Sequence, residues 1–212
     1  MISRLISFIV FTVTLIFSSS AQELKSGDLL FVIDSDSSFS SAITDATKAL
    51  SDSLSFVHVA ILEVQDDLKY NVIEANPKYG VRIVELKEFL EDTPKVNGAP
   101  GIIVKRLKID FPITQSLQLA RQHLGEKYDW WYLPDNDKMY CSELVYDSFL
   151  DSNGERIFEA KPMNFRKADG SMPEFWIKLF KELDSPIPEG LPGTNPNDLS
   201  KNPYLIEIYR YF

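Results

Sequence analysis

The hydrophobic pattern of the chain alternates between short apolar runs and longer segments with helical spacing. Short apolar runs that are bounded by turn-forming residues are typical of buried strands. We expect strands at six places: residues 28–33, 56–64, 70–75, 80–86, 102–107 and 204–212. The polar residues Gln65, Asp66 and Asp67 separate the second strand from the third, which indicates a turn between them.

Other segments place their apolar residues three or four positions apart, which is the spacing of one helix face. We expect helices at these places: roughly residues 39–52, a short one over 86–92, and then 113–124, 141–150 and 172–183. Gly125 is a typical end signal for the third, and Pro173 suits the first turn of the last. We expect loops over residues 94–101 and, because of five prolines and two glycines, over 184–203.

These elements indicate one α+β domain over residues 22–212. A chain of 212 residues is long enough to bury a proper core. We see no internal repeat and no linker that would divide it. The proline-rich stretch 184–203 comes too near the C-terminus to separate two domains, so we expect it to wrap over the surface.

Residues 1–21 have the pattern of a secretory signal peptide. One arginine precedes an apolar run from Leu5 to Phe17, and Ser19 and Ala21 follow at the spacing that a signal peptidase reads. An uncleaved membrane anchor is the alternative, but the apolar run is shorter than the roughly 20 residues of a membrane span. We therefore expect export to the periplasm or cell surface of a bacterium, with no stable membrane span after cleavage.

Composition narrows the chemistry. The net charge of −9 argues against nucleic acid as a partner, since binding phosphate backbones needs clustered lysine and arginine. One cysteine excludes an internal disulfide and a zinc site built from several thiolates. The sequence has no HExxH-like ligand cluster either, so we expect no metal and no cofactor. Of the two histidines, His123 falls near the end of a predicted helix, and we interpret it as a surface or structural residue.

Cys141 stands at the start of the predicted helix 141–150. A helix N-terminus presents free N–H groups and a partial positive charge, which stabilise both a thiolate and an oxyanion. Cys141 is therefore a candidate nucleophile. The alternative is a small buried apolar side chain, as most free cysteines are.

His58 and Glu74 fall on two strands that would form a hairpin. We expect a register in which Val64 opposes Tyr70. Glu74 then lies diagonal to His58 on the same face of the sheet, within reach of its side chain. Asn76 lies directly opposite His58 in the same register, so either Glu74 or Asn76 could orient the imidazole in a Cys–His–X triad. The alternatives are a hydrogen-bonded core histidine and a solvated carboxylate.

An ordered set of motifs resembles a known superfamily. The motifs are GDLLF (27–31), FVHVAI (56–61), VIEANPKYGV (72–81), LGEKYDWWY (124–132) and YCSELVY (140–146), with a weaker echo in NPNDLSKNPYL (195–205). The set is similar to the NlpC/P60 superfamily of papain-like cysteine peptidases, in the circularly permuted branch of YiiX/YaeF-type proteins, where the histidine strand precedes the cysteine helix. The resemblance implies a permuted papain-like fold, with an antiparallel sheet or small barrel packed against helices.

The resemblance also implies a role for each matching residue. Cys141 would be the nucleophile, His58 the base that takes its proton, and Glu74 the residue that orients His58. Tyr128 would line the site, and its hydroxyl would donate a hydrogen bond to the oxyanion. The alternative role for Tyr128 is aromatic packing. The pocket would be shaped by the two residues that flank the nucleophile, Tyr140 and Ser142.

We therefore expect an exported thiol hydrolase that cleaves an amide bond in a small peptide or amino-acid conjugate, such as one derived from peptidoglycan, through a cysteine thioester. The first alternative is a lipid acyl hydrolase or acyltransferase of the lecithin retinol acyltransferase kind. The permuted branch of YiiX/YaeF-type proteins resembles these enzymes as well. Trp130, Trp131 and Tyr132 could line an apolar groove. The second alternative is an inactive binding module or a structural protein of the cell envelope.

Overall fold

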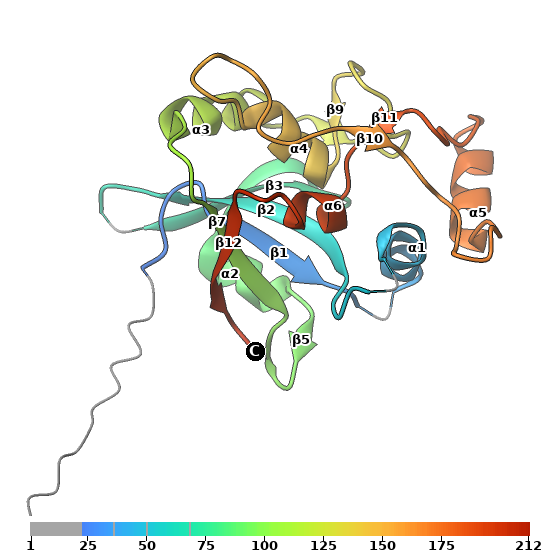
Figure 1. The fold of residues 1–212 in the computed structure, drawn as a ribbon, viewed down its shortest axis with the longest axis horizontal. Coiled ribbons are helices and arrows are strands. Elements are labelled where there is room, and N and C mark those ends of the chain that lie inside the picture. Colours follow the sequence, from blue (N-terminus) through green and yellow to red (C-terminus); the bar gives the residue numbers. More distant parts are fainter. Residues whose placement is uncertain (1–22, 36, 50, 68) are drawn as a thin grey trace, which may run out of the picture.

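A six-stranded antiparallel sheet lies at the centre of the structure, a computed structural model that describes residues 23–35, 37–49, 51–67 and 69–212 (Figure 1). The expected signal peptide, residues 1–21, lies outside the described residues. Within them, no helix combines the length and the apolar character needed to cross a membrane.

The strands follow the order β12-β7-β1-β2-β3-β4 across this sheet. Their bounds are β1 (Leu29–Ile33), β2 (Phe56–Val64), β3 (Tyr70–Asn76), β4 (Gly80–Glu85), β7 (Ile102–Leu107) and β12 (Leu205–Arg210). All six strands predicted from the sequence are confirmed to within two residues at each end. Since β4 and β12 end the order on opposite sides, the sheet is open and is not a closed barrel.

Helices pack around the sheet. Their bounds are α1 (Ser38–Thr47), α2 (Leu86–Asp92), α3 (Ile113–Gln122), α4 (Cys141–Ser148), α5 (Glu174–Glu182) and α6 (Pro196–Ser200). α4 packs on β2 and β3, α3 packs on α4, and α1 packs against α5. The first helix is shorter than the predicted 39–52, because Lys48 is already extended. In the turn that follows, the Asp52 carboxylate accepts the Ala49 N–H at 2.9 Å.

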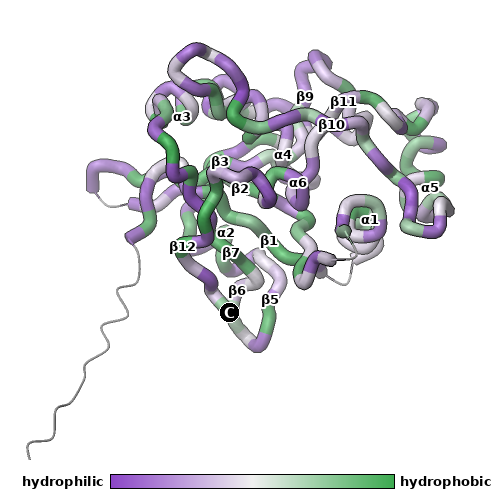
Figure 2. Tube along the Cα trace, in the orientation of Figure 1, coloured by the Kyte–Doolittle hydropathy of each residue, from purple (hydrophilic) through white to green (hydrophobic). Residues whose placement is uncertain are grey.

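The central strands β1, β2 and β3 are buried on both faces, which explains why they appear in the sequence as continuous apolar runs. On β1, Leu29 and Phe31 belong to the larger hydrophobic cluster, which also contains the buried face of α4. Leu30 and Val32 belong to a second cluster, together with Phe89 of α2. Figure 2 shows hydrophobic residues, in green, along β1 and β7.

Residues 94–101 are not the plain loop that we expected. They hold a hairpin of two short strands, β5 (Lys95–Val96) and β6 (Ala99–Pro100). Its turn is Asn97-Gly98, and both residues have positive φ angles, 51° and 84°. Asn-Gly is the dipeptide that two-residue hairpins favour, so the signal was present in the sequence.

The expectation that the prolines exclude regular structure from residues 184–203 is also wrong. The stretch contains β11 (Pro192–Gly193), which pairs with β10 (Lys161–Pro162), and the short helix α6. Pro196 occupies the first turn of α6, where a missing N–H costs nothing. Asn195 caps that turn, since its side chain accepts the Asp198 N–H at 2.8 Å.

One buried side chain, Asn197, ties α6 to the beginning of β2. Its Oδ1 accepts the Phe56 N–H at 2.8 Å, and its Nδ2 donates to the Phe56 carbonyl at 3.1 Å. Nδ2 also donates to Thr47 Oγ1 at 2.8 Å, at the end of α1. Phe56 lies two residues before His58, so this contact attaches the C-terminal segment to the strand that carries the candidate histidine.

We expect Asn197→Ala to lower the free energy of unfolding by about 2–4 kcal/mol, because it leaves the buried N–H and carbonyl of Phe56 without their partner. Urea denaturation measures the change. Asn153→Ala is the matched control, because Asn153 is exposed in a turn, and we expect it to change stability by less than about 0.5 kcal/mol. Native-like stability of Asn197→Ala would contradict the anchoring role.

Candidate active site

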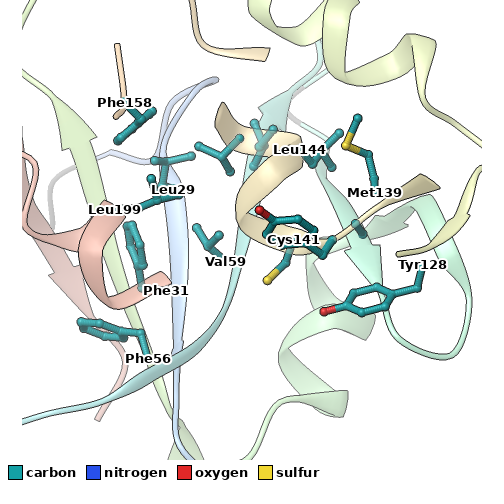
Figure 3. Packing of buried hydrophobic residues seen from close by; sticks show 14 of the residues in the cluster. Leu29, Phe31, Phe56, Val59, Tyr128, Met139, Cys141, Leu144, Phe158 and Leu199 are labelled. Carbon is teal, nitrogen blue, oxygen red and sulfur yellow. The ribbon is translucent and has the colours of Figure 1, made fainter. Parts of the chain in front are cut away.

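Cys141 is the first residue of α4, and its side chain is buried. Tyr140, in extended conformation, is the residue before the helix, and its N–H donates to Glu143 Oε2 at 3.3 Å. Figure 3 shows Cys141 in this first turn, with the Tyr128 ring on one side and Val59 of β2 on the other. The thiol therefore lies at the end of the helix where free N–H groups favour negative charge.

His58 lies on β2 with its side chain 16% exposed. Its Nε2 is 2.9 Å from Glu74 Oε2 on β3. The strands pair with Val64 opposite Tyr70, which is the expected register, and Glu74 thereby comes within reach of the imidazole. Because Nε2 is engaged by the carboxylate, Nδ1 is the ring nitrogen left for a second partner.

Cys141 lies near this imidazole and affects its pKa. Burial lowers the pKa of His58, but hydrogen bonds and charge interactions with Cys141 and Glu74 outweigh it and raise that pKa to about 10. The raised pKa favours the protonated form of the imidazole. A protonated imidazole beside a sulfur is the arrangement that stabilises a thiolate.

Glu74 is only 1% exposed, and two cationic groups surround its carboxylate. Arg82 is its direct neighbour across the β3–β4 pair and donates from Nε to Glu74 Oε1 at 2.7 Å. Burial raises the pKa of Glu74, but hydrogen bonds and charge interactions with His58 and Arg82 outweigh it and lower that pKa to about 2. Glu74 is thus charged at every pH at which the protein would work.

The sequence left open whether Glu74 or Asn76 contacts the imidazole. The hydrogen bond to His58 comes from Glu74, while Asn76 Nδ2 donates to Glu74 Oε1 at 3.2 Å. Asn76 therefore supports the carboxylate. Arg82 was missed altogether, although a cation in a strand that follows the carboxylate strand was a signal for it.

Tyr128 ends the short strand β8 (Lys127–Tyr128), which pairs with β9 (Lys138–Met139). The segment before it lies close to β4, since the Val81 N–H donates to the Glu126 carbonyl at 2.9 Å. Gly80 permits this approach, because a Cβ there would come within 2.2 Å of the same carbonyl oxygen. Burial raises the pKa of Tyr128 well above its ordinary value, so its hydroxyl stays a hydrogen-bond donor.

The residues that flank the nucleophile are held by Thr194 from the C-terminal segment. Its N–H donates to the Tyr140 hydroxyl at 3.1 Å, and its Oγ1 donates to Ser142 Oγ at 3.1 Å. Tyr140 and Ser142 thus shape the wall of the site. Thr194 was not found from the sequence, because a contact between residues so far apart in the chain leaves no local pattern.

Two cavities adjoin this group of residues. One, of about 60 Å³, has Cys141 in its lining and is several times larger than one water needs. The other, of about 190 Å³, is lined by His58 and Glu74. Val57 and Tyr128 line both cavities, so a substrate could approach the sulfur from one side and the imidazole from the other.

The second histidine lies apart from these cavities. His123 follows the last turn of α3, and its Nδ1 is 3.1 Å from the Glu126 carboxylate. Among the described residues, no group of three histidine, cysteine, aspartate or glutamate side chains comes close enough together to hold a metal ion.

Comparison with known proteins agrees with the geometry. The model of a family described as permuted papain-like amidase enzymes of the YaeF/YiiX type, the C92 family, matches residues 23–209. The uncharacterized protein YiiX of Escherichia coli K12 is 26% identical over 192 residues, which cover 89% of this chain and 87% of that protein. A crystal structure of YiiX from Escherichia coli O157:H7, described there as a metalloprotein, matches with a TM-score of 0.68 and 25% identity, over 89% of this chain and 98% of that one.

The depressed pKa of Glu74 makes stability depend on pH in the acid range. A carboxylate whose folded pKa is about 2, against about 4.5 when unfolded, stabilises the protein above pH 4.5, and the effect is lost as pH falls towards 2. We expect the native protein to lose about 3 kcal/mol more unfolding free energy than Glu74→Gln between pH 5 and pH 2.

Urea denaturation at each pH measures the difference. Glu182→Gln, at an exposed position of α5, is the control and should follow the native curve. If the native protein and Glu74→Gln lost the same unfolding free energy between pH 5 and pH 2, Glu74 would not be held as a charged group.

Proposed function

Because the chain belongs to the C92 family of permuted papain-like amidases, we propose that it is a thiol hydrolase that cleaves an amide bond in a small peptide or amino-acid conjugate through a Cys141 thioester. One observation carries the proposal: His58 contacts Glu74 through one ring nitrogen and leaves the other for Cys141. A histidine that served only to fill the core would need a hydrogen-bond partner. It would not need a cysteine at the start of a helix beside it.

In the first half of the reaction, the Cys141 sulfur attacks the carbonyl carbon of the amide, and its proton is held by His58. The raised pKa of His58 favours this charge-separated state before substrate arrives. The tetrahedral intermediate then collapses. The C–N bond breaks, His58 gives its proton to the leaving amine, and the acyl group stays on sulfur as a thioester.

In the second half, neutral His58 takes a proton from a water molecule as its oxygen attacks the thioester carbonyl. The C–S bond breaks, the acid leaves, and the proton on His58 remains beside the regenerated thiolate. Each intermediate carries a negative charge on the former carbonyl oxygen. The backbone N–H of Cys141 and the hydroxyl of Tyr128 are the two donors that we assign to it.

Glu74 and Arg82 act on the imidazole rather than on the substrate. By accepting from Nε2–H, Glu74 fixes the tautomer of the ring and leaves Nδ1 free to take the proton of the sulfur. Arg82 offsets the cost of burying the Glu74 carboxylate and fixes its position. We therefore assign both as positioning residues.

We also propose that residues 1–21 direct export, so that the reaction takes place in the periplasm or at the cell surface of a bacterium. The sequence pattern of these residues supports this. Peptides derived from peptidoglycan are amide substrates that fit that location.

A lipid acyl hydrolase or acyltransferase is the second candidate function. The cavity at Cys141 favours it through apolar lining residues such as Val57, Met163 and Phe165, which could take up an alkyl chain. The same thioester would form from an ester or amide of a fatty acid, and an alcohol or amine could replace water in the second half.

Alkylation of Cys141 tests the dyad without a known substrate, because iodoacetamide reacts with thiolates. We expect the native protein to react at pH 6 at more than about a tenth of its rate at pH 9, since protonated His58 stabilises the thiolate. An ordinary thiol with a pKa near 8.5 would retain under about 1%. We expect His58→Ala to behave like that ordinary thiol.

His123→Ala is the matched control, because it removes the other histidine and should keep the native profile. An ordinary profile in the native protein, or a native profile in His58→Ala, would rule out the dyad.

Replacement of Tyr128 tests the oxyanion role. We expect Tyr128→Phe to lower kcat for an amide that the native protein cleaves by about 100-fold, because one oxyanion donor is lost. The alkylation profile of Cys141 should not change, since alkylation forms no oxyanion. Tyr209→Phe, at an exposed position of β12, is the control. A parallel loss of alkylation in Tyr128→Phe would mean that Tyr128 acts only by packing.

A further inference from the structure

We propose that β12 is a dimer interface, at which the same strand of a second copy of this chain extends the central sheet by antiparallel pairing. The inference goes beyond the proposed function, because β12 carries none of the residues that we assign to catalysis. Since the two strands are identical, the contact is symmetric about a two-fold axis and closes as a dimer.

The two edges of the central sheet differ. β4 ends the sheet on one side, and its outer edge is covered there, since the Val81 N–H donates to the Glu126 carbonyl and the Val81 carbonyl accepts the Gly125 N–H, both at 2.9 Å. β12 ends the sheet on the other side (Figure 1). In the described part of the chain, no strand pairs with the outer edge of β12. An open edge of this kind is a template for pairing with another strand.

The backbone hydrogen bonds between β12 and β7 show which groups of β12 face outward. The Tyr204 carbonyl and the Tyr211 N–H both bond to the β7 side, at 2.9 Å and 3.1 Å. The direction of these groups alternates along an antiparallel strand. Glu207 comes three residues after Tyr204, and Arg210 comes one residue before Tyr211. Both therefore turn their backbone N–H and carbonyl groups away from β7, towards the open edge.

β12 is complementary to itself in one register. When Glu207 opposes Arg210 of the partner subunit, Arg210 opposes the partner subunit's Glu207. Opposing residues lie on the same face of a sheet, so each acid meets a base. These residues also have their backbone groups free to exchange hydrogen bonds. A shift by one residue in either direction would lose both charge pairs.

The other opposing pairs in this register are apolar or aromatic: Leu205 with Phe212, Ile206 with Tyr211, and Ile208 with Tyr209. The two members of a pair also share a face of the sheet. Leu205 and Phe212 both pack on the larger hydrophobic cluster. Ile208 packs on the second cluster, which also contains Val104, the residue of β7 opposite Tyr209.

A β-bulge interrupts the pairing of β12 with β7, because the register shifts by one residue between Glu207 and Tyr209. A bulge on one strand alone would also disturb pairing on the outer side. In the symmetric dimer, the same bulge occurs on both strands. Two residues, 208 and 209, then separate the charge pairs on each strand, so the two strands stay in register.

The side chains of β12 are more exposed than a solvated edge would favour. Ile206 is 41% exposed and Tyr209 is 38% exposed, and Tyr204 lies beside the strand at 46%. Exposed apolar side chains that gather in one place are typical of interaction surfaces, and tyrosine is enriched at protein interfaces. Edge strands that avoid pairing commonly carry lysine or proline, and residues 205–210 contain neither.

Glu207 and Arg210 already form an ion pair within the strand, with two nitrogen–oxygen contacts of 3.0 Å. Both side chains are 41% exposed, so each can take a further partner. An isolated exposed ion pair adds little stability, whereas a network of several charges adds more. The dimer would join two such pairs into a network of four charges.

Sedimentation of the native protein over a range of concentrations tests the interface. We expect a dimer with a dissociation constant of about 1–100 µM, because an interface of one strand is small. Glu207→Arg and Arg210→Glu should each raise that constant at least about 10-fold, because each places like charges opposite one another in both pairs.

Mixing the two variants separates the interface from folding. In a mixed dimer of Glu207→Arg with Arg210→Glu, opposite charges meet again in both pairs. We therefore expect the mixture to form a one-to-one dimer with about the native affinity, and the double variant Glu207→Arg/Arg210→Glu to dimerise as well. Circular dichroism and thermal melting show whether each single variant is folded.

Glu174→Arg is the matched control, because it breaks another exposed ion pair, with Lys178 at 2.8 Å on α5, and should leave the dimer intact. A native protein that stays monomeric up to about 500 µM, well above the expected dissociation constant, would overturn the proposal. So would a dimer that both single variants preserve, folded variants that do not associate when mixed, or oligomers that grow beyond the dimer.

Discussion

The hydrogen bond between His58 and Glu74 joins two neighbouring strands, and it exists in only one register. A shift of β3 by one residue would turn Glu74 to the other face of the sheet and leave His58 without a carboxylate. The bond also needs Arg82, because a carboxylate buried this deeply is unfavourable unless cations surround it. The charge interactions of the site therefore depend on three paired strands: the β2–β3 hairpin, and β4 on the other side of β3.

The nucleophile reaches these strands from a distant part of the chain. α4 packs on β2 and β3, so its first residue, Cys141, lies over the strand that carries His58. The C-terminal segment then holds α4 and β2 together. Thr194 contacts the residues that flank Cys141, and Asn197 binds the strand that leads to His58. The proline-rich stretch therefore contributes directly to the geometry of the site.

Much of this arrangement could be predicted from local patterns. Short apolar runs bounded by turn-forming residues predicted all six strands of the main sheet. The turn before Tyr70 predicted the register that brings Glu74 to His58. Arg82 has a local signal, a cation in the strand that follows the carboxylate strand, because it faces Glu74 across the β3–β4 hairpin. Asn197 has none, because its partner Phe56 is far away in the chain and is set by packing. The α6 helix was missed for a different reason. A proline disfavours the interior of a helix, but Pro196 lies in the first turn, where a helix accepts proline.

The central claim is that Cys141 carries the acyl group of the substrate, and a trapped thioester tests it most directly. Native protein is mixed with N-acetylglycine p-nitroanilide, quenched in acid within the first turnovers and digested for mass spectrometry. We predict that the peptide with Cys141 gains the mass of one acetylglycyl group, that hydroxylamine removes it, and that His58→Ala shows far less of it. Release of p-nitroaniline with no acyl group on Cys141, or with the group on another residue, would contradict the account.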